Sequence, residues 1–113
     1  MVYRGRRRRR YLWIAVRGET SFAYNDVAEA IQRSVLNLFG VEGLSLAEPK
    51  LIDFDEGVQS GILRCNHLQL DNLRAALAHV TSIEGSAAAI HVLNASGTIK
   101  SLKKKTKYSY ELS

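Results

Sequence analysis

The stretch PKLIDFDEGVQSGILRC, residues 49–65, contains two short, largely apolar runs on either side of an acidic, glycine-containing turn. The first run is PKLIDF, the turn is DEG, and the second run is VQSGILRC. Two such runs joined by turn residues are typical of a β-hairpin. The stretch therefore predicts two antiparallel strands in the middle of the chain.

A strand and a helix are predicted before this hairpin. In YLWIAVR, residues 11–17, the side chains alternate between two faces, which is the pattern of a strand. From residue 26 to residue 39, the apolar residues fall on one helical stripe. Asp26 followed by Glu29 resembles a capping box, and Gly40 is expected to end the helix.

A second helix and a fourth strand are predicted after the hairpin. Asn66 can cap this helix, with Gln69 three residues later, and we expect the helix to end at Gly85. AAAIHVLN, residues 87–94, has the composition of a buried strand. A short basic helix is expected over residues 98–105.

The predicted order β-α-β-β-α-β indicates an α+β fold. We expect a ferredoxin-like, RNA-recognition-motif-like sandwich: a four-stranded antiparallel sheet with both long helices on one face, followed by the basic helix. The same topology occurs in RNA-recognition domains, metabolite-sensing modules and small phosphatases, so the fold alone does not decide the function.

The length of 113 residues and the hydrophobic content of 46% are those of one globular domain. We place this domain at residues 11–107, between a basic arm at 1–10 and a tail at 108–113. No apolar run approaches the ~20 residues of a membrane-spanning helix, and a signal peptide is not expected. One cysteine cannot form an internal disulfide, so we expect a cytoplasmic location.

Positive charge is concentrated at the two ends of the chain. Residues 1–10 hold six arginines and no acid, and residues 100–113 hold five lysines and one acid, whereas the segment between them is acidic. This distribution indicates binding to a polyanion. Alternatively, the ends are only hydrated, or the arginines form a nuclear localisation signal. The predicted nucleic-acid contacts are Arg4, Arg6, Arg7, Arg8, Arg9, Arg10, Ser96, Gly97, Thr98, Lys100, Lys103, Lys104, Lys105 and Lys107.

The stretch NASGT, residues 94–98, is expected to end the last strand and to start the C-terminal helix with Thr98 near its N-cap. Free amides at that helix start would attract an anion, and a positive φ would explain the glycine at Gly97. The spacing places Lys100, Lys103, Lys104 and Lys107 on one helical side. The structural alternative is that Ile99 and Leu102 dock the helix on the sheet while the lysines stay hydrated.

The sequence shows no catalytic set and no metal-binding motif. The three histidines lack HxxxH or HxH spacing, and Cys65 is expected to be a small buried residue. Asp53, Asp55 and Glu56 around the hairpin turn are interpreted as hydrated turn residues rather than cation ligands.

The aromatic residues do not follow the common RNA-recognition motif. In that motif the third strand carries aromatic side chains on which bases stack, and VQSGILRC has none. Tyr11 and Trp13 share one face of the first strand. We expect this face to be partly exposed and to contact a protein partner. The alternative is that the C-terminal helix covers this face.

Three consecutive segments together resemble archaeal ribonuclease P protein component 2. They are PKLIDFDEGVQSGILRC, the leucine-striped helix after it and VLNASGTIKSLKKK. That family is related to a eukaryotic subunit shared by ribonuclease P and ribonuclease MRP, and the similarity extends from RYLWIAV to the lysine helix. The resemblance implies a noncatalytic subunit of the ribonucleoprotein that removes the 5′ leader from precursor tRNA. It implies that the RNA does the chemistry with magnesium ions, that the protein binds no cofactor, and that component 3, a TIM-like barrel, is its partner.

Two other classes of function remain open from the sequence. One is a ribosome-associated or other RNA-binding protein of the same fold, which would bind RNA without a barrel partner. The other is a metabolite-sensing regulatory module, for which the basic ends would be incidental.

Overall fold

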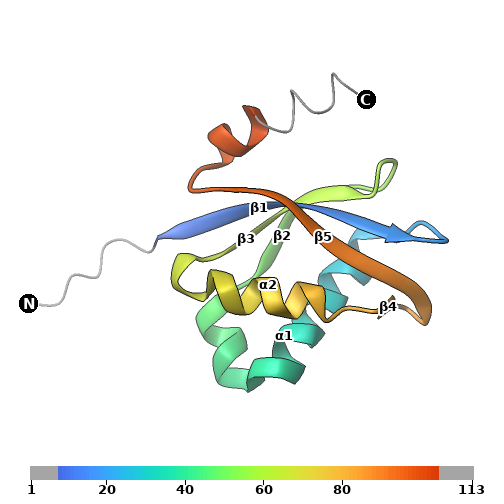
Figure 1. Cartoon of the computed structure of the whole chain (residues 1–113), viewed down its shortest axis with the longest axis horizontal. Helices are drawn as coiled ribbons and strands as arrows, with labels where there is room; N and C mark the ends of the chain where they lie inside the picture. The colour runs from blue at the N-terminus through green and yellow to red at the C-terminus, as the bar shows by residue number, and fades with distance from the viewer. Residues whose placement is uncertain (1–7, 105–113) are drawn as a thin grey trace, which may run out of the picture.

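A computed structural model gives the fold of the chain and describes residues 8–104. Two helices lie on one side of a twisted sheet, and the C-terminal helical segment lies on the other side (Figure 1). The elements are β1 Arg9–Gly18, α1 Tyr24–Ala47, β2 Lys50–Asp55, β3 Ser60–Asn66, the 3₁₀ helix η1 His67–Gln69, α2 Leu70–Ala78, β4 Ser82–Ile83, β5 Ser86–Ser96 and the helical residues 99–104. The strand order is β2-β3-β1-β5-β4, and all pairs are antiparallel. Within residues 8–104, no helix has the length and hydropathy to span a membrane.

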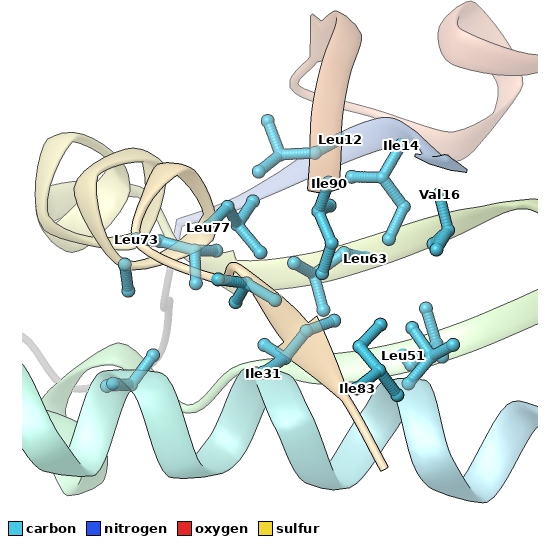
Figure 2. Packing of buried hydrophobic residues seen from close by; sticks show 14 of the residues in the cluster. Leu12, Ile14, Val16, Ile31, Leu51, Leu63, Leu73, Leu77, Ile83 and Ile90 are labelled. Atoms are coloured by element: carbon cyan, nitrogen blue, oxygen red, sulfur yellow. The ribbon is translucent and has the colours of Figure 1, made fainter. Parts of the chain in front are cut away.

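The main hydrophobic core lies between the sheet and the two helices. Leu12 and Ile14 of β1 are fully buried on this face, where Leu63 of β3, Ile31 of α1 and Leu77 of α2 also pack (Figure 2). The alternation predicted for β1 is therefore confirmed, because every second side chain points toward the helices.

The two ends of α1 differ from the sequence prediction. The helix begins at Tyr24, two residues before Asp26, and its N-cap residue is an alanine without a capping side chain. Instead, the amide of Tyr24 donates to Glu56 Oε2 in the β2–β3 turn at 2.9 Å, so a carboxylate distant in sequence supports the helix start. Gly40 interrupts the helix as predicted, with φ 74°, but the chain then continues helically to Ala47.

The second half of the chain contains a strand that the sequence analysis did not predict. Asn66 caps the helical segment as expected, because its side chain accepts a hydrogen bond from the amide of Leu68 at 3.0 Å. However, α2 ends at Ala78 rather than at Gly85. Glu84 and Gly85 both have positive φ, at 51° and 80°, and form the two-residue loop between β4 and β5. Positive φ at both central residues is the geometry of a type I′ hairpin turn.

The α+β fold with an antiparallel sheet is thus confirmed, and the count of four strands was wrong. The sheet has five strands, and the additional one is the two-residue β4. Glycine serves equally well as a helix stop and as a turn residue, so the local sequence at Gly85 was compatible with both.

Candidate nucleic-acid interface

The topology brings the start of β1 and the end of β5, which adjoin the two basic segments, to one edge of the sheet. β1 lies between β3 and β5 and is antiparallel to both, so the start of β1 meets the ends of its two neighbours. Arg9 pairs with Asn66 of β3, and Tyr11 pairs with Ser96 of β5. β1 begins at Arg9, so two of the arginines expected in the N-terminal arm belong to the sheet.

A hollow of about 610 Å³ opens at this edge. Its described lining comprises Arg8, Arg9 and Arg10 from the N-terminal side, Gly97 and Thr98 from the C-terminal side, and Tyr11 and His67. None of these residues is acidic. The predicted contacts from opposite ends of the sequence therefore line one common surface, and Tyr11 and His67 join them there.

Three other hollows of the described chain differ from this one, because each has at least one acidic residue in its lining. One of about 60 Å³ beside Arg8 and Arg9 includes Glu48, and one of about 590 Å³ at the far end of β1 includes Glu19. A third, of about 460 Å³ between α1 and residues 79–85, includes Glu84 and further acids. Carboxylates repel phosphate, so the hollow at the basic edge is the better candidate for a polyanion site.

Sequence reasoning overlooked two cations near this edge, Arg64 and Lys50. Arg64 of β3 lies opposite both Tyr11 of β1 and Lys50 of β2 in the strand register. Residues opposite each other in a sheet share a face, so the two cations and Tyr11 form one row across it. The signal was present in the hairpin 49–65, because pairing its two strands places these two basic residues side by side.

The C-terminal segment starts as the sequence predicted. Thr98 Oγ1 accepts a hydrogen bond from the amide of Ser101 at 3.1 Å, and the amide of Leu102 donates to the Thr98 carbonyl oxygen at 3.1 Å. Thr98 is therefore the N-cap, although its hydroxyl uses one of the amides expected to attract an anion. The exposed lysines of the described segment are Lys100, Lys103 and Lys104.

The turn before this helix departs from two expectations. Ser96 is buried, and its Oγ accepts from the amide of Thr98 at 3.4 Å, so this hydroxyl serves the turn. Gly97 does not have a positive φ. Among the described residues, a Cβ added at Gly97 would meet only Arg10 Nη1, at an ordinary contact distance of 3.9 Å. The glycine therefore leaves space beside the Arg10 guanidinium rather than relieving backbone strain.

Several predicted contacts lie outside the described residues, and their placement stays a prediction. They are Arg4, Arg6, Arg7, Lys105 and Lys107.

The face of the sheet that points away from the main core is partly covered by the C-terminal segment. Leu102 is fully buried there against Trp13 and Ile62, with Tyr11 at the margin. The indole of Trp13 donates to Ser60 Oγ, which holds the ring in place. Trp13 is only 9% exposed, so it lies beneath the helix rather than on an open surface. Its contact with a protein partner stays a prediction.

The groups that sequence analysis weighed for catalysis are used structurally or lie apart. Cys65 is 1% exposed; burial raises the pKa of its thiol to about 11, and the charges of Arg10 and Arg74 lower it by less. Asp55 Oδ1 accepts from the amide of Gly57 at 2.9 Å within the turn. Among residues 8–104, no three histidine, cysteine or acidic side chains gather closely enough to hold a metal ion.

Comparison with known proteins shows the family of the chain. The model of the Rpp14/Pop5 family matches residues 10–107. Ribonuclease P protein component 2 of Thermococcus gammatolerans is 42% identical over 100 residues, covering 88% of this chain and 83% of the relative. The protein of that name from Methanosarcina mazei is 33% identical over 95 residues, covering 84% and 80%. A chain in the cryo-EM structure of yeast ribonuclease MRP superposes with a TM-score of 0.69 at 12% identity, covering 98% of this chain and all of that one, which shows a shared fold. This chain therefore belongs to the Rpp14/Pop5 family.

Proposed function

We propose that this chain is a protein subunit of ribonuclease P, the ribonucleoprotein that removes the 5′ leader from precursor tRNA. It binds and stabilises the catalytic RNA and does not perform the chemistry. Family membership supports the assignment. The observation that carries the RNA-binding role is the meeting of Arg8, Arg9 and Arg10 with Gly97 and Thr98 around one hollow whose described lining has no acidic residue.

The remaining expectations follow from the same assignment. The catalytic magnesium ions are held by the RNA, and the assembly works in the cytoplasm. The order of the long strands, β2-β3-β1-β5, supports a ferredoxin-like description of the fold.

The partner protein is the TIM-like barrel subunit, component 3. Tyr11 and Trp13 remain the proposed contact on this chain. Tyr11 is half-buried at the margin of the covered patch, so a partner can reach it directly. Contact with Trp13 requires the C-terminal segment to move, because Leu102 packs on the indole.

The test is reconstitution of precursor-tRNA cleavage from the full chain, the barrel subunit and the ribonuclease P RNA of the same organism. Addition of this chain should raise cleavage at limiting magnesium, because neutralising phosphates stabilises folded RNA. Asp53→Ala and Asp55→Ala should retain cleavage close to the wild-type rate. A several-hundredfold loss in either variant, with folding and RNA affinity unchanged, would contradict the noncatalytic role. A chain that neither binds this RNA nor raises cleavage would refute the assignment itself.

A further inference from the structure

The three arginines at the sheet edge line an open hollow of about 610 Å³, which is large enough for a small ligand. We propose that the hollow lined by Arg8, Arg9, Arg10, Tyr11 and Gly97 binds one nucleotide of single-stranded RNA, with its backbone phosphate on the guanidinium of Arg10. The kind of ligand rests on the proposed function. The location of the site rests on the residues that line the hollow and on the buried Arg10 Nε, which has no hydrogen-bond partner among the described residues.

Arg10 lies where the start of β1 meets the end of β5. It pairs with Cys65 of β3 in the strand register, and its Nη1 lies 3.9 Å from the position of a Cβ at Gly97. Its Nε is buried and has no hydrogen-bond partner among residues 8–104. A buried donor without an acceptor is rare in folded proteins. The position of Arg10 is thus not explained by an internal hydrogen bond from this atom.

The charge around Arg10 favours an anionic ligand. Arg8 and Arg9 line the same hollow, and its described lining contains no carboxylate to balance them. Neighbouring cations repel one another, and an anion placed among them relieves that repulsion. Arginine presents a planar fork of donors that matches two phosphate oxygens, which a lysine ammonium cannot reproduce.

The aromatic lining favours a nucleotide over a small free anion. A volume of about 610 Å³ is large enough for a nucleotide, but the hollow at the far end of β1 is nearly as large, so the size permits this ligand and the lining favours it. Tyr11 is only half-buried and lines the hollow, so in the chain without its protein partner the ring is available for stacking with an unpaired base. The lysines of residues 99–104 do not line the hollow, but they are exposed on the helix that begins after Thr98 and add positive charge to this part of the chain.

Gly97 provides a way to close the hollow without changing its charge. Its φ is not positive, and a Cβ there makes only an ordinary contact with Arg10. Gly97→Leu therefore introduces a side chain into the hollow with little backbone strain. Arg10→Lys keeps the charge and removes the planar fork. Arg17→Ala is the control outside the hollow: it removes a whole positive charge from an exposed arginine at the opposite end of β1.

The experiment titrates the full chain with hexauridylate, a short single-stranded RNA, and follows the Arg10 Nε–H resonance by NMR together with the affinity. The expected result is a shift of this resonance in the wild type and an affinity loss of about tenfold in Gly97→Leu and in Arg10→Lys. Arg17→Ala should bind nearly as the wild type does. Circular dichroism and melting curves check that each variant is folded, and the two hollow variants act by different means, so misfolding of one leaves the other decisive.

Two outcomes would overturn the inference: equal affinities of both hollow variants and Arg17→Ala, or an Arg10 resonance that does not respond to hexauridylate. Inorganic phosphate serves as the comparison ligand, and an equal response to it at the same concentration would refute the nucleotide part. The proposed function is tested separately by reconstitution. A chain that binds hexauridylate but neither binds the ribonuclease P RNA nor raises cleavage would refute the ribonuclease P assignment and keep the hollow. Stimulated cleavage without hexauridylate binding would keep the assignment and refute the hollow.

Discussion

Leu102 is the residue on which the placement of the lysine helix depends. It is fully buried, and its buried partners on the outer face of the sheet are Trp13 and Ile62, in a cluster separate from the main core. Leu102→Ala removes three carbons, which at about 0.8 kcal/mol each corresponds to about 2.4 kcal/mol of lost burial. Since about 1.4 kcal/mol is a factor of ten, the docking equilibrium should shift by about fiftyfold toward the undocked helix. A short helix has little stability of its own, so we expect it to leave the sheet.

Trp13 reports this event directly, because it is the single tryptophan of the chain and is 9% exposed. Undocking should expose the indole and shift its fluorescence emission to longer wavelength. RNA affinity should fall as well, because the lysines lose their fixed position although the charge is unchanged. The melting temperature should fall less than in Leu77→Ala, since Leu77 belongs to the main core and its loss costs about 2–5 kcal/mol.

Two controls make the test specific. Leu102→Met conserves the volume and should keep the emission of the wild type. Leu93→Ala makes the same chemical change at a leucine that is 43% exposed on β5 and should alter neither emission nor RNA affinity. If Leu102→Ala behaves as Leu93→Ala does in both measurements, the docking of the helix by Leu102 is refuted.

Three further predictions concern other parts of the molecule. Gln59→Ala removes three side-chain hydrogen bonds that tie the β2–β3 turn to itself and to the segment before α1; it should cost about 1–3 kcal/mol, seen as a lower midpoint in urea. The raised pKa of Cys65 means that the unfolded thiol ionises first, so the free energy of unfolding should fall as pH rises from 9.0 to about 11, by about 3 kcal/mol at most. Cys65→Ala should flatten this decline. If the free energy of unfolding of Cys65→Ala falls as steeply with pH as that of the wild type, the Cys65 thiol is not its cause. Alanine at Lys100, Lys103 and Lys104 should reduce the log–log salt slope of RNA binding by about 0.7–0.9 for each lysine that contacts phosphate, whereas arginine should preserve it; unchanged slope and affinity would mean that these lysines are only hydrated.

Features that depend on neighbouring residues in the chain were predictable from the sequence. Such features result from side-chain periodicity or from a backbone preference that acts over a few residues. They are the alternation in β1, the hairpin over 49–65, the caps at Asn66 and Thr98, and the break at Gly40. The basic ends were visible because charge is a property of composition. The family resemblance was likewise carried by contiguous motifs, and the match over residues 10–107 confirmed it.

The tertiary structure decided what depends on contacts between distant residues. Glu56 supports the start of α1 from another turn, and Gly85 closes a hairpin because β5 is present for β4 to pair with. Trp13 is covered because Leu102 docks on it. The meeting of Arg10 with Gly97 follows from the central, antiparallel position of β1 in the sheet. Periodicity specifies which side of a strand faces a core, but strand order and register are set by the packing of the whole sheet, and these bring Arg10 beside Gly97.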